Sequence, residues 1–169
     1  MLQKNSAYSG TLPFVVLVIL ASVVILGGIV FSQKSLMGQE FTIQGREHIA
    51  DGATHSAYNS NPPTSGWHYA QDAEWGVYQT ELPDEQLVHN LEHGGIWISY
   101  KSLDAETKAE LEAIGKSTTK VIVEPRAKND TTIALASWGR LLKLSAFDAE
   151  KIREFIATNK NNAPESLVN

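Results

Sequence analysis

The histidines are the residues of this chain whose type and spacing are best suited to chemistry. All five lie in one stretch of the sequence, and no histidine follows it: His48, His55, His68, His89 and His93. Imidazole is the commonest metal ligand and acts as an acid or base near neutral pH, so this clustering favours a metal or catalytic site. The chain has no Cys, which excludes thiolate zinc sites, iron–sulfur clusters and disulfides. The remaining donors are imidazole and carboxylate, which suit copper, zinc, iron or nickel.

Two of these histidines are four residues apart, in the segment His89-Asn90-Leu91-Glu92-His93. On a helix this spacing places both imidazoles on one face, with Cβ atoms about 5–6 Å apart, where they can bind one metal ion. Glu92 follows His89 by three residues and shares the rim of that face. Because this helix supplies only two imidazoles, a stable site needs a further ligand from elsewhere in the chain.

The further ligands are expected from the segment that precedes this helix. His68 is the best candidate, because Pro62 and Pro63 limit the freedom of the loop before it and can hold an imidazole in place. His48 is the next candidate, at the end of a short predicted strand. His55 is the least convincing candidate, because it lies among small residues in a loop.

Two other interpretations of the histidines stay open. The letters His89-x-x-Glu92-His93 match the inverted zincin pattern, in which two histidines bind zinc and the glutamate activates a water molecule. The chain would then be a zinc-dependent hydrolase with Glu92 as its catalytic base, although this pattern is short. Alternatively the imidazoles only pack against neighbours such as Trp67 and Trp75, and the chain is an accessory subunit of a membrane protein complex.

Capping residues and apolar periodicity predict the elements that position these side chains. Three short helices each begin at an aspartate that can cap the first turn: Asp84 for residues 85–93, Asp104 for residues 104–114 and Asp148 for residues 148–159. Gly115 is expected to stop the second helix. Short apolar or alternating runs predict strands over residues 41–43, 96–100, 120–123, 131–138 and 140–144.

The remaining long segment, residues 50–75, has no sustained periodicity but is rich in aromatic residues, which predicts an ordered and packed loop. The order of elements predicts an α+β domain over residues 40–160, with a small mixed or antiparallel sheet and two to three helices. The chain has 169 residues, enough for one such domain. A polar tail over residues 161–169 is expected to fray.

The N-terminal part predicts a membrane anchor. Residues 12–31 contain no charged side chain, and a helix of that length spans about one hydrocarbon core. A cleaved signal peptide would have a shorter apolar region followed by a small-x-small cleavage site, which this segment lacks. The sequence therefore predicts a short tail over residues 1–11, one transmembrane helix over residues 12–31 and a linker over residues 32–39.

Charge limits the partners of the chain. Residues 1–35 contain Lys4 and Lys34 and no acid, so the remaining residues carry 12 basic and 19 acidic side chains, a net charge of −7. Such an acidic domain is not a general nucleic-acid binder. Lys4 and Lys34 flank the apolar segment almost evenly, so charge alone does not orient it. The Cys-free composition fits an oxidising space, and we expect the N-terminus inside and the domain outside the membrane.

Several motifs resemble the bacterial domain-of-unknown-function 3105 family. They are Gly45-Arg46-Glu47-His48-Ile49, Asn61-Pro62-Pro63-Thr64-Ser65-Gly66-Trp67-His68-Tyr69, Trp75-Gly76-Val77-Tyr78, Leu87-Val88-His89-Asn90-Leu91-Glu92-His93-Gly94-Gly95-Ile96 and Ala136-Ser137-Trp138-Gly139-Arg140. The resemblance covers about residues 40–160 and implies one N-terminal membrane segment with an extracytoplasmic domain. It also implies that four histidines belong to the shared pattern, with His55 outside it: His48, His68, His89 and His93.

These observations predict a single-pass membrane protein whose extracytoplasmic domain binds one transition metal ion, with copper ahead of zinc. His89 and His93 would form the helical pair, His68 the loop ligand, and His48 a fourth ligand or a partner of one. Glu92 would orient a ligand or form the rim of the site. The expected role is binding, handling or delivery of the metal to a partner, rather than enzymatic turnover.

Overall fold

The structure is a computed structural model that describes residues 35–166. The predicted tail over residues 1–11 and the predicted transmembrane helix over residues 12–31 lie outside the described residues. Within the described range, no helix has the length and apolarity needed to cross a bilayer.

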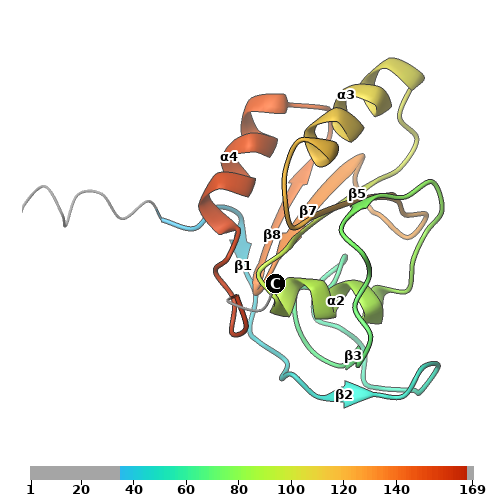
Figure 1. Cartoon of the computed structure of the whole chain (residues 1–169), viewed down its shortest axis with the longest axis vertical. Coiled ribbons are helices and arrows are strands. Elements are labelled where there is room, and N and C mark those ends of the chain that lie inside the picture. Colours follow the sequence, from blue (N-terminus) through green and yellow to red (C-terminus); the bar gives the residue numbers. More distant parts are fainter. Residues whose placement is uncertain (1–34, 167–169) are drawn as a thin grey trace, which may run out of the picture. The chain divides into compact units, whose positions relative to one another are not determined.

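A mixed six-stranded sheet forms the centre of the domain, in the order β1-β8-β7-β5-β6-β4 (Figure 1). Its strands are β1 (Gln39–Glu40), β4 (Gly76–Val77), β5 (Ile96–Tyr100), β6 (Val121–Pro125), β7 (Ile133–Ser137) and β8 (Arg140–Leu144). The pairs β1–β8, β8–β7 and β7–β5 are antiparallel, and the pairs β5–β6 and β6–β4 are parallel. A separate parallel pair joins β2 (His48–Ile49) to β3 (His68–Tyr69).

Three helices cover the sheet within residues 35–166: α2 (Asp84–Glu92), α3 (Ala105–Lys116) and α4 (Ala149–Asn159). Figure 1 shows α3 and α4 on one side of the sheet and α2 on the other, with β2 and β3 beyond α2. The predicted α+β class, with a small mixed sheet and two to three helices, is confirmed for the described residues.

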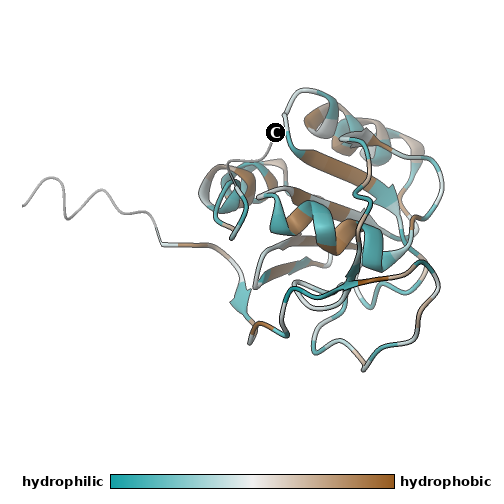
Figure 2. Ribbon diagram, turned by 60° about the horizontal axis from the view of Figure 1, so that its bottom comes forward, coloured by the Kyte–Doolittle hydropathy of each residue, from teal (hydrophilic) through white to brown (hydrophobic). Residues whose placement is uncertain are grey.

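Two apolar cores result from this layering, because both faces of the central strands are covered. Alternate residues of β5 enter different cores: Ile96 and Ile98 pack toward α3 and α4, whereas Trp97 packs toward α2. All five residues of β5 are buried, as expected for a strand buried on both faces. Figure 2 shows the apolar residues gathered on the central strands and on the helix sides that face them.

The aspartate caps predicted from sequence are confirmed for two helices and wrong for one. The carboxylate of Asp104 accepts a hydrogen bond from the Thr107 backbone N–H, and that of Asp148 accepts one from Lys151. Asp84 instead lies inside the first turn of α2, because the helix begins one residue earlier than predicted, after Pro83. Its carboxylate is therefore free to form an ion pair elsewhere.

Three further predictions differ from the structure. Helix α3 continues through Gly115 to Lys116, and the missing Cβ matters there because it would lie 2.5 Å from Cγ2 of Val123. Residues 41–43 form no strand, since the chain leaves the sheet after β1. The tail expected to fray over residues 161–169 is described only as far as residue 166, and this part is bonded beside the end of α2: Asn161 N donates to Gly94 O (2.8 Å) and Glu165 N to Glu92 O (3.1 Å).

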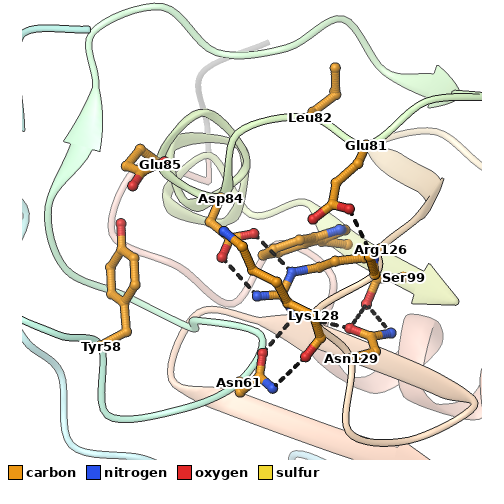
Figure 3. Close-up of polar contacts among 12 residues, drawn as sticks. Tyr58, Asn61, Glu81, Leu82, Asp84, Glu85, Ser99, Arg126, Lys128 and Asn129 are labelled. Carbon is orange, nitrogen blue, oxygen red and sulfur yellow. Dashed lines mark hydrogen bonds and ion pairs between the residues drawn. The ribbon is translucent and has the colours of Figure 1, made fainter. Parts of the chain in front are cut away.

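The start of α2 is held in place by the buried side chain of Arg126 (Figure 3). Its Nε and Nη2 donate to the two carboxylate oxygens of Asp84 at 2.8 and 2.7 Å. Its Nη1 donates to the Oδ1 atoms of Asn61 (2.6 Å) and Asn129 (3.0 Å), and its guanidinium lies over the ring of Trp97. One side chain thus joins the long loop, helix α2 and the turn after β6.

Glu124 is a second buried charged group beneath α2. Its Oε2 accepts a hydrogen bond from Leu82 N (2.7 Å), and its Oε1 accepts one from Trp97 Nε1 (3.0 Å). Burial raises the pKa of Glu124 to about 7, although these two hydrogen bonds, both from neutral donors, lower it. The nearby carboxylates of Asp84 and Glu81 raise this pKa further.

Replacing Arg126 by leucine should destabilise the domain strongly. Arg126→Leu leaves Asp84, whose side chain is only 11% exposed, without its partner, and breaking a buried pair in this way costs about 3–5 kcal/mol. The free energy of unfolding can be followed through tryptophan fluorescence. Lys143→Ala is the matched control, because it breaks an exposed pair with Asp130 and should cost about 1 kcal/mol or less. Equal losses for both variants would contradict this prediction.

Glu124 should make the domain less stable as the pH rises from about 4.5 to about 7. In that window the folded state keeps a proton that the unfolded state has lost, so the free energy of unfolding falls by about 3 kcal/mol and then stays level. Glu124→Gln keeps the side-chain size and removes this titration. The difference in unfolding free energy between the two proteins should therefore vary with pH across the window, and parallel pH profiles would refute the assignment.

Candidate metal centre

Three imidazoles and one carboxylate come together beside α2. His48, His68, His89 and Glu92 each offer one ligand atom, and these atoms all lie within 4.8 Å of one another. His68, His89 and Glu92 are buried, whereas His48 is exposed. The group therefore has a closed inner side and one ligand at the surface.

Two local structures bring these side chains together. His48 and His68 are direct partners in the parallel β2–β3 pair, so their side chains lie next to each other. His89 and Glu92 are three residues apart on α2, which places them on the same helix face. Helix α2 packs against β3, and the imidazoles of the strand pair consequently meet the polar face of the helix.

The tautomers of the two buried histidines are fixed by backbone carbonyls. His68 Nδ1 donates to Gly66 O, and His89 Nδ1 donates to Tyr69 O, both at 2.7 Å. A carbonyl oxygen only accepts hydrogen bonds, so Nδ1 of each ring carries the hydrogen. In the neutral ring the Nε2 lone pair is then available, which is the arrangement that metal-binding histidines usually have.

The spacing of the three rings fits a single metal ion. Ring centroids lie 4.7 Å apart for His48 and His68, and 5.0 Å apart for the pairs that His89 forms with each of them. Imidazoles bound to one ion through nitrogens at about 2.0–2.1 Å have centroids about 4.5 Å apart at a right angle and about 5.1 Å apart at a tetrahedral angle. All three separations fall within this range.

The buried contact between His68 and Glu92 requires a cation. His68 Nε2 lies 3.0 Å from Glu92 Oε2, and these side chains are 0% and 3% exposed. The two atoms nevertheless form no hydrogen bond, and His68 Nε2 is a buried polar atom without a partner. A nitrogen lone pair and a carboxylate oxygen that face each other away from water repel, so a proton or a metal ion must lie between them.

Electrostatics around His89 favour the form that binds metal. Burial lowers the pKa of His89, the Tyr69 carbonyl partly opposes this, and the nearby His93 and His68 lower it further. The ring is therefore held neutral, and neutral imidazole is the form that coordinates a metal ion. The donor set and its protonation both fit a transition metal ion.

The structure places His93 beside the group rather than in it. The centroid of its ring lies 4.5 Å from that of His89. Its nitrogens, however, face two carboxylates: Nδ1 lies 3.5 Å from Asp72 Oδ2, and Nε2 lies 3.5 Å from Glu165 Oε2. His93 follows the last residue of α2 as its C-cap. In the inverted zincin pattern, His89 and His93 would bind zinc and Glu92 would be the base. The structure instead groups Glu92 with His89 as a candidate ligand and leaves His93 outside the group.

His55 lies outside the group. Its ring stacks on that of Trp67, its Nδ1 donates to Ser56 O (2.7 Å), and its Nε2 faces Glu85 Oε1 (3.1 Å). These contacts fasten the long loop to α2 through Glu85. His55 thus has a structural environment distinct from that of the other histidines.

Two residues of this group differ from the sequence-based expectation. Glu92, expected to orient a ligand or form the rim of the site, is itself one of the four candidate donors, and its spacing of three residues from His89 is a signal for a ligand on the same helix face. Arg46 was not singled out, and its Nε lies 3.6 Å from Glu92 Oε1. No spacing rule predicts that contact, because it joins the segment before β2 to a helix far away in the sequence.

Comparisons with known proteins give one family. Searches of the curated proteins and of the solved structures return no significant match. A sequence model for the family described as "Protein of unknown function (DUF3105)" matches residues 49–169, which include His68, His89 and Glu92 and begin directly after His48. This span is more than half of the chain, and it agrees with the resemblance seen in the sequence motifs. The chain therefore belongs to the DUF3105 family.

Proposed function

We propose that this protein binds one divalent transition metal ion through His48, His68, His89 and Glu92. The observation that carries the proposal is the buried approach of His68 Nε2 to Glu92 Oε2 at 3.0 Å without a hydrogen bond. Two further observations support the same conclusion. The Nδ1 atoms of His68 and His89 donate to backbone carbonyls, and the three imidazole rings lie at the separations expected around one ion.

The donor chemistry favours zinc or divalent copper. Three imidazoles and one carboxylate are borderline and hard donors, whereas monovalent copper prefers sulfur ligands. The chain has no Cys, and the four donor groups include no methionine. Divalent copper outcompetes zinc at most nitrogen and oxygen sites, so the native metal must be measured in protein isolated without added metal.

The arrangement of donors favours metal binding or handling over catalysis. Catalytic zinc sites typically use three protein ligands and leave the fourth position for water or substrate, whereas structural sites use four. Here the four donor groups converge on one point. An ion held by all of them has no free position in a tetrahedral geometry, and the proposed role is therefore to hold or transfer the metal.

We further propose that residues 12–31 anchor the domain outside the cytoplasmic membrane. The support is the uncharged run of residues 12–31, the acidic domain that follows it and the absence of Cys. A membrane-bound partner that donates or accepts the metal is the kind of partner that such an anchor would bring close.

Metal content tests the proposed site. The full-length chain, purified in mild detergent, should contain about one metal ion per chain by inductively coupled plasma mass spectrometry. His68→Ala and His89→Ala should each lose this metal, since each removes a buried donor. His55→Ala is the matched control and should keep it. A wild-type protein that is isolated without metal and also fails to bind added zinc or copper would refute the proposal.

Cysteine labelling tests the proposed orientation, since the chain has no Cys of its own. Lys116→Cys replaces a side chain that is 64% exposed and should react with a membrane-impermeant maleimide in intact cells. Ser6→Cys lies in the N-terminal tail and should react only after lysis. The opposite labelling pattern would place the domain on the cytoplasmic side.

A further inference from the structure

His48 differs from the other three donors in exposure and in support. It is exposed, whereas His68, His89 and Glu92 are 0%, 6% and 2% exposed. Within residues 35–166, its ring lies against the rings of His68 and His89, and no hydrogen bond fixes its nitrogens. The β2–β3 pair therefore sets the position of His48 beside His68, but no hydrogen bond fixes the rotation of its ring.

The other three donors are buried, and hydrogen bonds orient two of them. The Nδ1 bonds to Gly66 O and Tyr69 O orient His68 and His89. Glu92 is 2% exposed at the end of α2, whose last turn is tied down by the hydrogen bond from Glu165 N to Glu92 O, so burial confines its carboxylate. These three side chains form a preformed half-site that does not depend on His48.

The segment that carries His48 is held by hydrogen bonds near its ends rather than at the His48 ring. Gln44 N donates to Ser65 Oγ (3.1 Å) and Gly52 N to Tyr69 Oη (3.2 Å), while strand β2 between them has only two residues and pairs with β3 alone. Arg46 on the same segment is half exposed and faces Glu92 and Glu165 at 3.6 and 3.8 Å, which are longer than hydrogen bonds. Gly45 (φ +101°) and Gly52 (φ +75°) bound the segment in left-handed conformations, and glycines at such positions commonly act as hinges.

We propose that His48 is the exchangeable ligand of the site, through which the metal ion enters and leaves while His68, His89 and Glu92 keep their places. This inference rests on the proposed function. In the exchange step the bond between the metal and the His48 nitrogen breaks, and a nitrogen or oxygen lone pair of the incoming acceptor forms a new bond. The charge of the ion does not change, so no oxidant or reductant is needed.

The geometry also defines the chemical class of acceptor. The half-site is closed on the side of α2, so a new donor can reach the ion only from the side of His48. An imidazole or another small nitrogen donor has the size and softness of the ligand that it replaces. The inferred acceptor is therefore a molecule that presents an exposed imidazole-like group to this face.

Chemical rescue by free imidazole tests the assignment in the full-length protein. In His48→Gly, the affinity for divalent copper or zinc should fall about 10–100-fold, and transfer of the metal to a chromophoric chelator should become faster by a similar factor. Added imidazole should restore the affinity and the visible spectrum of the copper form, because the vacated position opens to solvent. His68→Gly is the matched control, and imidazole should not restore it, since that ring is fully buried.

The outcomes separate this inference from the proposed function. A wild-type protein that binds no metal overturns both. A wild-type protein that binds metal while His48→Gly keeps the same affinity and release rate overturns only the role of His48. Equal rescue of His48→Gly and His68→Gly also overturns it, because the buried and exposed ligands would then be equivalent. Circular dichroism of each variant confirms that the fold is retained.

Discussion

A buried imidazole nitrogen and a buried carboxylate oxygen that face each other 3.0 Å apart are stable only with a cation between them. His68 and Glu92 are in this position, and the architecture around them keeps them there. The carbonyl of Gly66 prevents the His68 ring from turning its Nδ1 hydrogen toward Glu92. Glu92 in turn belongs to a helix that cannot move away without disrupting the core beneath it. The site is therefore a consequence of how α2 is fixed.

Helix α2 is fixed at both of its ends. At its start, Asp84 is held by Arg126, and the preceding Leu82 N–H bonds to the buried carboxylate of Glu124. At its end, the chain turns through Gly94 (φ +80°). A Cβ at this position would lie 2.8 Å from Cα of Asn161, so only glycine permits this close approach of the C-terminal segment. The same constraints that hold the helix also set the direction of its ligands toward β3.

Periodicity and capping chemistry predicted most of the fold, because they depend on local sequence. Asp104 and Asp148 cap their helices as predicted, and β8 spans the predicted residues. The β2–β3 pair was not predictable in this way, since two-residue strands have no periodicity. For the site, spacing favoured His93 over Glu92, yet i+3 and i+4 both share a helix face. The choice between them depends on the direction of β3, which is a tertiary relationship.

The charges around the proposed site favour a divalent ion over a proton alone. Glu92, Asp72 and Glu165 contribute three carboxylates in and beside the ligand group, and Arg46 contributes one guanidinium, so these groups have a net charge of −2 when the imidazoles are neutral. A single proton on His68 would leave part of this charge uncompensated in a partly buried region, whereas a divalent cation balances it. His93 lies between Asp72 and Glu165, so it keeps these two carboxylates close to the site without occupying a ligand position. In the proposed site the outer groups would therefore favour a divalent ion, and the inner donors would select its chemical type.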